Sequence, residues 1–368
     1  MARLDEICLL NMGQSPDSST YNEDGEGMPF FQGNADFGEI NPKIRVWCTE
    51  PTKIANVGDI LISVRAPIGA LNIANTKCCI GRGLAALTVR EDLCVKEYLW
   101  HAIKSKVDEL NSKGTGSTFK AINKNILAET NVPLYSLKEQ KEIANIFDKM
   151  DELISCRKEQ LLKLDELVKA RFVEMFGDPE NNKSGLIKIG EIGALTSGGT
   201  PSRTKPEYFK GDIRWYSAGE LNSLYLPDSV EHISETALQQ SSAKLFNKGT
   251  LMIGMYDTAA FKMGILTENS SSNQACANLN PNPEYNIIWL YYLFDIMKPV
   301  FLQERQGVRQ KNLSLSKIRE FEVPFAPFEL QNQFAAFVEQ TEKTKAEVQK
   351  SLDELEILKK SLMQKYFG

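Results

Sequence analysis

The sequence predicts an α+β protein built from two similar globular domains, each followed by a long helix. Three observations support this fold class. A chain of 368 residues is longer than one hydrophobic core usually serves. Its second half repeats the order of motifs in its first half, and each half ends in a stripe of apolar residues that favours helix pairing. We therefore expect globular domains over residues 1–132 and 181–323, and long helices over residues 133–180 and 324–368.

The repeat is clearest in the two helical segments. NVPLYSLKEQKEIANIF, which begins at Asn131, matches EVPFAPFELQNQFAAFV, which begins at Glu322. The match continues without a gap to the pairs Phe176-Gly177 and Phe367-Gly368. It aligns Pro133 with Pro324, Gln140 with Gln331, and Leu164 with Leu355. Because both copies end on Phe-Gly, we expect the chain to hold both repeats in full.

The globular segments repeat more faintly. LDEICLLNMGQSP from Leu4 is similar to IGEIGALTSGGTP from Ile189, and NVGDILIS from Asn56 is similar to NKGTLMIG from Asn247. The apolar runs DILISV and TLMIGM follow Asn-x-Gly turns and predict buried strands. Apolar helical segments follow in each copy, KEYLWHAIKSKVDELN and IIWLYYLFDIMKPVFLQ. Each globular domain is therefore expected to combine strands with helices.

The long helices carry apolar residues at alternating steps of three and four, which is the spacing of coiled-coil packing. A continuous helix of about 40 residues would be roughly 60 Å long and would not be stable in water with its apolar edge exposed. The simplest closed arrangement packs the two helices antiparallel, as a coiled-coil bar with pseudo-twofold symmetry that separates the globular domains. The residues expected between the helices are Ile143, Phe147, Ile154, Leu161, Leu164 and Val168 in the first, and Phe334, Val338, Val348, Leu352, Leu355 and Leu362 in the second.

The composition narrows the class of protein. No run approaches the roughly 18 uncharged apolar residues of a membrane span, and the first residues include acids where a signal peptide needs an apolar core. The seven cysteines are scattered and never in CxxC spacing, which argues against disulfides and zinc sites. We therefore expect a soluble, cytoplasmic protein with reduced thiols and no metal.

The sequence offers little for catalysis. Its two histidines, His101 and His232, lie outside any metal-binding frame, although histidine is the commonest general base near neutral pH. His101 follows Trp100 in a helical run, where a structural role is the simplest explanation. No phosphate loop, dinucleotide-binding glycine motif or amino-methyltransferase motif is present. We expect no catalytic residues and no cofactor.

The duplicated motifs resemble those of the specificity subunit of type I restriction–modification systems. They are GQSP and GGTP at the domain starts, NVGDILIS and NKGTLMIG in the expected sheets, IGRGLAAL and NQACANL later in each domain, and the helix entries Pro133/Gln140 and Pro324/Gln331. The resemblance covers the chain from end to end. Its specificity lies in the duplicated order, because each motif alone is weak.

The resemblance implies a function as well as a fold. Two target-recognition domains, residues 1–132 and 181–323, would each read one half of a split, asymmetric site in double-stranded DNA. The two helices would hold these domains apart and dock DNA methyltransferase (modification) subunits, of which two are expected. A restriction-translocation subunit would join the complex. This chain would then supply the choice of sequence, while its partners supply the chemistry.

The charge distribution fits DNA binding only locally. A net charge of −5 and a pI near 5.5 do not suit a free-standing DNA binder, whose affinity comes largely from phosphate contacts. Residues 112–125 and 303–319 are nevertheless rich in Lys and Arg together with Gly, Asn and Gln. Arg and Lys reach phosphates or guanine edges, and Asn or Gln pair with adenine. Solubility alone would also explain basic loops.

Candidate DNA-binding residues follow in both halves of the chain. In the first half they are Gln14, Ser15, Arg65, Arg82, Ser117, Lys120 and Lys124, and in the second half Arg203, Lys205, Tyr256, Asn273, Gln274, Arg305, Arg309 and Lys311. Arg65 and Arg82 align with residues of other types, as two domains that read different half-sites would require. Differences in packing would explain the same observation.

Two other functions stay open at this point. A duplicated coiled-coil scaffold that binds only proteins would explain the long helices and their acids, but it does not require divergent globular domains with basic loops. The recognition end of a fused restriction–methylation enzyme would also carry such repeats. The sequence reveals neither the two half-site sequences nor the spacer length, because base readout depends on side-chain geometry and DNA shape.

Overall fold

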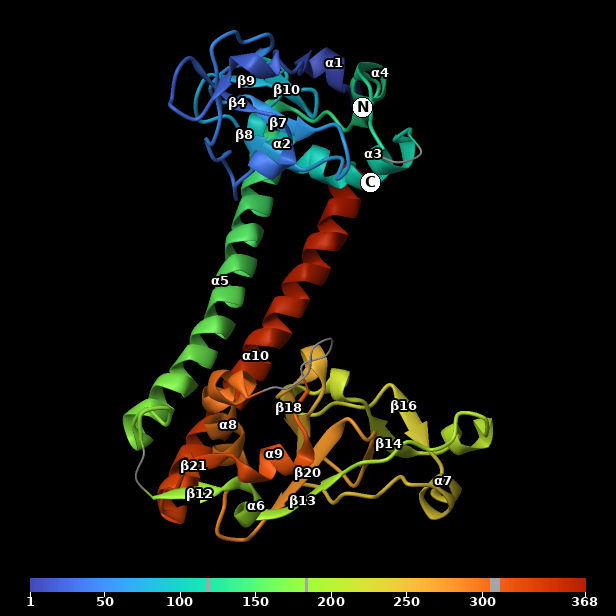
Figure 1. The fold of residues 1–368 in the computed structure, drawn as a ribbon. Coiled ribbons are helices and arrows are strands. Elements are labelled where there is room, and N and C mark those ends of the chain that lie inside the picture. The colour runs from blue at the N-terminus through green and yellow to red at the C-terminus, as the bar shows by residue number, and fades with distance from the viewer. Residues whose placement is uncertain (117–119, 183–184, 305–311) are drawn as a thin grey trace. The chain divides into compact units, whose positions relative to one another are not determined.

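The computed structural model describes residues 1–116, 120–182, 185–304 and 312–368. These residues form two compact units (Figure 1). Unit 1 comprises Met1–Lys158 and Lys350–Gly368, and unit 2 comprises Glu159–Gln349. Each unit therefore contains one globular region together with part of each long helix.

The globular region of unit 1 is built on two sheets. The first has the order β2-β10-β7-β8, and all of its pairs are antiparallel. The second has the order β3-β5-β4-β9-β6. A small third sheet pairs β1 with β11. The strands of unit 1 are β1 (Ala2–Arg3), β2 (Cys8–Met12), β3 (Tyr21–Asn22), β4 (Met28–Phe31), β5 (Trp47–Cys48), β6 (Ile54–Ala55), β7 (Ile60–Ser63), β8 (Leu71–Ile73), β9 (Cys78–Ile80), β10 (Leu84–Val89) and β11 (Asn131–Val132). Its helices besides the long ones are α1 (Leu4–Ile7), α2 (Lys96–Ser105), α3 (Val107–Lys113) and α4 (Lys124–Ala128), with 3-10 turns η1 (Ser18–Thr20) and η2 (Asn34–Asp36).

Unit 2 repeats this plan with additions. Its main sheet has the order β13-β20-β17-β18-β15, in which β15 extends the four-stranded pattern, and a smaller sheet has the order β16-β14-β19. The strands are β12 (Leu186–Lys188), β13 (Gly193–Ser197), β14 (Ile213–Tyr216), β15 (Asn222–Tyr225), β16 (Glu231–Ile233), β17 (Leu251–Gly254), β18 (Met263–Ile265), β19 (Ser271–Ser272), β20 (Cys276–Pro281) and β21 (Glu322–Pro324). The shorter helices are α6 (Ile189–Ile192), α7 (Glu235–Gln240), α8 (Ile287–Gln303) and α9 (Leu315–Glu320), with turns η3 (Pro206–Phe209), η4 (Ala218–Glu220) and η5 (Asp257–Ala259). The expected α+β class is confirmed.

The two expected buried strands, β7 in unit 1 and β17 in unit 2, are interior strands of the main sheet of their unit. In β7, Ile60 and Ile62 join the core that covers α2, while Leu61 joins the core on the opposite face. In β17, Leu251 and Ile253 likewise face the core that covers α8. A strand that is buried on both faces has no polar side, and this explains the continuous apolar runs in the sequence.

The helix expected from Lys96 differs in one respect. It is divided at Lys106 into α2 and α3, whereas its counterpart α8 continues from Ile287 to Gln303. The backbone of Lys106 leaves the α-helical region at ψ 3°, and its N–H bonds to the Ile103 carbonyl three residues back. The apolar pattern spans this break, so the pattern alone could not locate it.

The long helices α5 (Leu137–Phe176) and α10 (Phe328–Phe367) each follow a proline by four residues. Near the start of α5, the fully buried Gln140 accepts a hydrogen bond from Val95 N at 2.8 Å and donates one to Tyr135 O at 2.9 Å. Gln331 near the start of α10 does the same with Asn286 N at 2.7 Å and Ala326 O at 2.7 Å. The repeated glutamine thus ties each helix to the globular region of its own unit.

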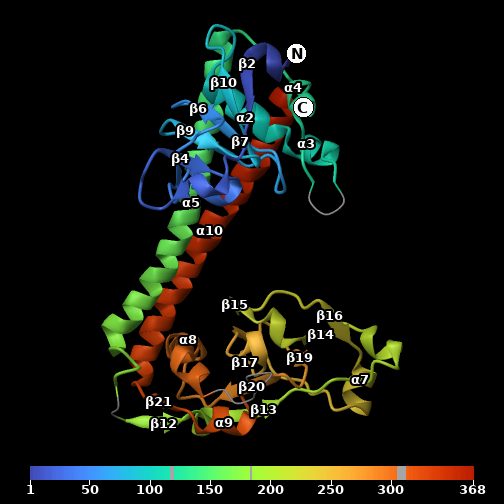
Figure 2. The same cartoon turned by 45° about the horizontal axis from the view of Figure 1, so that its top comes forward.

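Within each unit the two helices run side by side and antiparallel (Figure 2). In unit 1, Asp151 pairs with Lys359, and Lys158 pairs with Glu356 at 3.0 Å, so numbers rise along one helix as they fall along the other. In unit 2, Asp165 pairs with Lys345 at 2.7 Å. Of the residues expected between the helices, Ile143, Phe147, Val168, Phe334, Val338 and Leu352 are buried, and Ile154, Leu161, Leu164, Val348, Leu355 and Leu362 are partly buried.

Membrane spans, metal-binding groups and cysteines were considered across the described residues. No helix among them is long and apolar enough to cross a membrane. Across the same ranges, no group of three or more His, Cys, Asp and Glu side chains is placed to hold a metal ion. All seven cysteines lie within these ranges as free thiols, and Cys156 is exposed while the other six are buried.

Candidate nucleic-acid interface

The candidate residues of unit 1 meet where several strands end. Gln14 N donates to Ile80 O at 3.0 Å, just after β2, and Arg82 N donates to the Ser15 hydroxyl at 3.2 Å. Beyond β7, Ala66 N donates to Lys120 O at 3.0 Å. We call Gln14, Ser15, Arg65, Arg82 and Lys120 the unit 1 loop cluster. Ser15 is partly buried, and the other four side chains are exposed.

The basic loop of unit 1 is held against this cluster by its backbone. Ala121 forms antiparallel bridges with both Arg65 and Thr115, which brings Lys120 close to Arg65 in the loop after β7. Lys124 is exposed at the first position of α4, and Asn123 caps that helix by accepting a bond from Ile126 N at 3.0 Å. Ser117 lies outside the described residues.

A hollow of about 500 Å³ borders the unit 1 loop cluster. Its wall includes Ser15 and Arg82 together with Tyr21, Phe30 and Gln32. The rings of Tyr21 and Phe30 stack with centroids 4.7 Å apart, and Gln32 Oε1 accepts a bond from the Ser15 hydroxyl at 3.1 Å. Burial raises the pKa of Tyr21, so its hydroxyl keeps its proton near neutral pH, and it donates this proton to Pro16 O at 3.0 Å.

Sequence reasoning missed Gln32 and Tyr21. A signal for Gln32 was present, because Phe30-Phe31 aligns with Trp215-Tyr216 and the next residue changes from Gln32 to Ser217. No comparable signal marked Tyr21, which lies in the two-residue strand β3, and the pairing of β3 with β5 holds its backbone beside Cys48.

Unit 2 brings a corresponding but chemically different set together. Gly199 N donates to Ser272 O at 2.9 Å, as Gln14 N does to Ile80 O in unit 1. The next residue, Thr200, donates a hydrogen bond from its side chain to that of Gln274. Tyr256, which lies after β17, is 40% exposed. We call Thr200, Tyr256 and Gln274 the unit 2 loop cluster.

Asn273 has a different place. Its side-chain oxygen accepts bonds from Ala275 N at 3.0 Å and from the Cys276 thiol at 3.4 Å. This carbonyl is therefore engaged in its own turn between β19 and β20.

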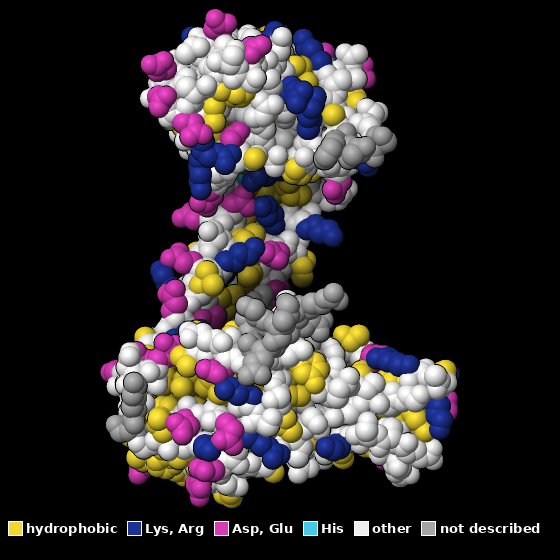
Figure 3. Space-filling view, viewed as in Figure 1, with side chains coloured by type: hydrophobic (Ala, Val, Ile, Leu, Met, Phe, Trp, Pro, Cys, Tyr) yellow, Lys and Arg dark blue, Asp and Glu magenta, His cyan; other side chains and the backbone are white. Residues whose placement is uncertain are grey.

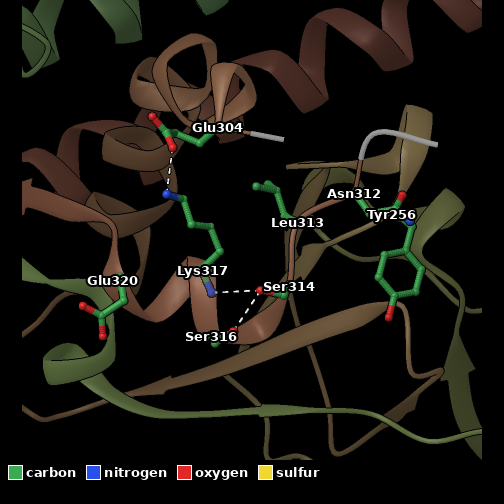
Figure 4. A pocket seen from close by; sticks show the side chains of 8 residues that line it. All are labelled: Tyr256, Glu304, Asn312, Leu313, Ser314, Ser316, Lys317 and Glu320. Atoms are coloured by element: carbon green, nitrogen blue, oxygen red, sulfur yellow. Dashed lines mark hydrogen bonds and ion pairs between the residues drawn. The ribbon is translucent and has the colours of Figure 1, made fainter. Parts of the chain in front are cut away.

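A hollow of about 460 Å³ lies beside Tyr256 (Figure 4). Lys317 pairs with Glu304 across it at 2.7 Å, and the Ser314 hydroxyl caps α9 by accepting from Lys317 N at 3.1 Å. Glu304 and Asn312, which line the hollow, flank the second basic segment. The candidates Arg305, Arg309 and Lys311 lie outside the described residues.

Arg203 and Lys205 have partners within unit 2. Arg203 forms a two-pronged ion pair with Glu231, and its guanidinium lies 4.3 Å from the Phe209 ring centroid. The hydrogen bond from Arg203 lowers the pKa of the Glu231 carboxyl, so the pair stays charged at neutral pH. Lys205 donates to the Tyr208 hydroxyl at 2.8 Å. The charge of Arg203 is therefore largely compensated by an acid of its own unit.

The long helices present a mixture of charges. Figure 3 shows Lys and Arg interspersed with Asp and Glu along the helices on the face in view. Large apolar side chains are exposed as well, with Leu162 at 65% and Ile357 at 70%. The acids in the sequence therefore do not gather into a surface of one sign on that face.

A family model matches most of the chain. The model described as "Type I restriction modification DNA specificity domain" matches it twice, over residues 1–166 and 181–356.

Among curated relatives, the putative type I restriction enzyme MjaX specificity subunit of Methanocaldococcus jannaschii is 40% identical over 158 residues, which are 43% of this chain and 37% of that protein. The MjaIX specificity subunit of the same organism is 26% identical over 53% of this chain and 49% of its own length. The EcoBI specificity subunit of Escherichia coli is 22% identical over 84% of this chain and 73% of its own. The chain thus spans less than half the length of the first two relatives that it matches.

Solved structures support the fold. The type I restriction–modification S subunit from M. genitalium aligns over 100% of this chain and 95% of its own, with a TM-score of 0.60 and 17% identity. A structure from work on complex assembly and conformational transition of the type I R-M system aligns over 99% and 96%, with a TM-score of 0.66 and 15% identity. At these identities the likeness concerns the fold alone.

Proposed function

Because the chain belongs to the type I restriction modification DNA specificity family, we propose that it is the specificity subunit of a type I restriction–modification complex and reads a bipartite, asymmetric site in double-stranded DNA. In this proposal residues 1–132 and 181–323 are the target-recognition domains. Residues 133–180 and 324–368 are the helices that set the distance between the half-sites. The complex works in the cytoplasm, where its DNA lies.

One observation carries the proposal. Two loop clusters stand on matching backbone hydrogen bonds in the two units, yet their side chains differ in type. Arg65, Arg82 and Lys120 offer cations in unit 1, where Thr200, Tyr256 and Gln274 offer neutral hydrogen-bonding groups in unit 2. Arg pairs with the acceptor edge of guanine and Gln pairs with adenine in the major groove. Two domains with matching backbone hydrogen bonds and different side chains are suited to recognise two different half-sites.

The chemistry belongs to the partners in this proposal. The two histidines are held by their own unit, with His101 Nε2 at 2.8 Å from Asp148 and His232 Nε2 at 3.0 Å from Asp228. We propose that two methyltransferase subunits dock on the long helices, where exposed apolar residues such as Leu162 and Ile357 offer contact area, and that a restriction-translocation subunit completes the complex. Isolated chain should then show no methyl transfer, nucleotide hydrolysis or DNA cleavage.

A domain exchange tests the division of labour. Residues 1–132 are replaced by the matching segment of a relative, the chain is assembled with its methyltransferase, and the methylated motif is read by single-molecule sequencing. One half of the motif should change and the other half should persist. The matched control exchanges residues 181–323 and should change the opposite half. The proposal is contradicted if one exchange changes both halves of the motif. It is also contradicted if neither exchange changes the motif, as expected for a scaffold that binds only proteins.

A second experiment separates spacing from sequence. About four residues inserted after Leu161 add one turn, or about 6 Å, to the first helix. The insertion should change the spacer length or abolish binding while both half-sites keep their sequence. A changed base preference at an unchanged spacing would show that the helices do more than set distance.

A further inference from the structure

Gln32 follows β4 and lines the hollow of about 500 Å³ beside the unit 1 loop cluster. Its backbone is held by two segments of unit 1. Gln32 N donates to Asp36 Oδ2 at 2.7 Å, and Gln32 O accepts from Gly83 N at 3.2 Å. The backbone from which this side chain extends is therefore fixed before any ligand binds, as precise recognition requires.

The amide of Gln32 is oriented by Ser15. The Ser15 hydroxyl donates to Gln32 Oε1 at 3.1 Å and accepts from Arg82 N at 3.2 Å. Gly81 leaves room for this bond, because a Cβ atom at that position would lie 2.7 Å from Gln32 Oε1. Gln32 Nε2 forms no hydrogen bond with the described residues. Gln32 therefore presents two N–H donors, while its acceptor is already engaged.

Unit 2 contains the same arrangement on a different segment. Thr200 aligns with Ser15, and its hydroxyl donates to Oε1 of Gln274. Gln274 lies between β19 and β20, whereas Gln32 lies directly after β4. The two glutamines thus come from different parts of the repeat, and the hydroxyl is what they share. A hydroxyl at one position of the repeat orients an amide in both units.

The wall of the hollow next to Gln32 is largely apolar. It includes the side chains of Pro16, Tyr21, Phe30 and Val46. Asp36 also lines the hollow, but both of its oxygens are occupied. Its Oδ1 pairs with Arg45, and its Oδ2 accepts from the backbone of Gln32 and Gly33. The charge of Asp36 is therefore compensated within unit 1, and an apolar group beside Gln32 would meet carbon.

We propose that Gln32 and this hollow recognise a thymine in the half-site of unit 1, an inference that rests on the proposed function. In the major groove, thymine presents the acceptor O4 next to its C5-methyl group, and no other unmodified base presents that combination. Gln32 Nε2 donates to O4, while the methyl group contacts Phe30 and Val46. A bidentate pair with adenine needs the amide oxygen, which in Gln32 is engaged by Ser15. Ser15 is a positioning residue and does not touch the base.

The test uses the chain assembled with its methyltransferase, and competition binding with duplexes that carry the methylated motif. The domain exchange described above identifies the half-site of unit 1. Each of its thymines is replaced by uracil, which lacks only the methyl group, or by 5-methylcytosine paired with guanine, which keeps the methyl group but presents a donor in place of O4. At one position uracil should weaken binding about fourfold, as expected for one methyl group in an apolar site. At the same position 5-methylcytosine should weaken it about tenfold or more.

Variants assign that position to Gln32. Gln32→Ala should remove both differences there and leave discrimination at the half-site of unit 2 intact. Gln32→Glu should favour 5-methylcytosine over thymine, because a carboxylate accepts from the N4 group of cytosine. Ser15→Ala should reduce the discrimination against 5-methylcytosine, because the amide is then free to turn. Ser15→Thr keeps a hydroxyl, as Thr200 does in unit 2, and should retain that discrimination.

The outcomes separate this inference from the proposed function. The inference is overturned if no thymine of the unit 1 half-site responds to both replacements, or if the response survives Gln32→Ala, while the complex still discriminates both half-sites. The proposed function then stands. A complex that discriminates no DNA sequence contradicts both. The base replacements change only the DNA, so they test the inference even where a variant fails to fold.

Discussion

The two units use the same backbone to hold different side chains. Val64 N donates to Gly83 O at 2.9 Å in unit 1, and Met255 N donates to Ala275 O at 2.9 Å in unit 2. The residue that follows is Arg65 in one unit and Tyr256 in the other. Strand registers depend on backbone groups and buried faces, so loop residues at their ends are free to vary. A duplicated frame can therefore carry two independent surfaces.

The largest effect is expected from charge placed between the helices. Leu164 and Leu355 are aligned, partly buried members of the two apolar stripes. Leu164→Asp and Leu355→Asp should each lower the free energy of unfolding by about 3 kcal/mol or more, because a carboxylate without a partner loses hydration there. Denaturant titration of both variants measures this.

Leu162→Asp is the control for that prediction. Leu162 is 65% exposed on the same helix, so this change should stay within about 0.5 kcal/mol of the parent chain. If Leu164→Asp were as stable as Leu162→Asp, Leu164 would not belong to the helix interface. Weaker assembly of Leu162→Asp with the methyltransferase would support the docking surface.

A smaller effect is expected at the buried glutamines. Gln140→Ala leaves Val95 N without its acceptor, and Gln331→Ala does the same to Asn286 N. Each variant should lose about 2–3 kcal/mol in unfolding free energy, since each leaves a backbone donor unpaired. The loss should be somewhat larger for Gln140→Ala, because Gln140 Nε2 also donates to Leu93 O at 3.1 Å, whereas Gln331 Nε2 donates to Ala326 O. If Gln331→Ala left the free energy of unfolding unchanged while Gln140→Ala lowered it, the two glutamines would not stabilise their helix starts in the same way.

The loop clusters should respond separately. Arg82→Ala and Gln274→Ala should each weaken binding of the assembled complex by about 1–3 kcal/mol, and only for DNA that carries the half-site of the same unit. Competition binding with each half-site permuted measures this. Arg3→Ala is the control, because it removes a cation of unit 1 outside the cluster and should change affinity little. Loss of discrimination at both half-sites from either change would argue against separate readers.

The sequence predicted what depends on local pattern. The period of the apolar residues marked both long helices, and continuous apolar runs marked β7 and β17. The repeat singled out Gln140 and Gln331 but did not predict that they bond to the globular regions, because the backbone donors Val95 and Asn286 lie far along the chain. The same limit applies to Arg203, which was chosen for its charge, while Glu231, its partner, lies far along the chain in β16.

The smallest effect concerns pH and one pair of aligned residues, His101 in unit 1 and Tyr292 in unit 2. His101 is 1% exposed, and burial lowers its pKa, although Asp148, which bonds to Nε2, and the charge of Asp151 act in the opposite direction and Lys104 adds to the lowering. Its Nδ1 has no partner among the described residues, so protonation there would bury an unpaired N–H as well. Burial raises the pKa of Tyr292, which stays neutral across the same range.

The sign of the pH effect follows from where His101 binds its proton. Above the pKa of an unfolded histidine, about 6.5, both states are neutral and His101 causes no pH dependence. As the pH falls below that value, His101 binds a proton in the unfolded chain but stays neutral in the folded chain, because its folded-state pKa is lower. The free energy of unfolding therefore decreases. His101→Tyr should therefore reduce the loss of stability between pH 7.5 and pH 5.5, and Tyr292→His should increase it. Denaturant titrations at the two pH values measure both, and an unchanged loss in folded His101→Tyr would show that other groups carry the acid sensitivity of unit 1.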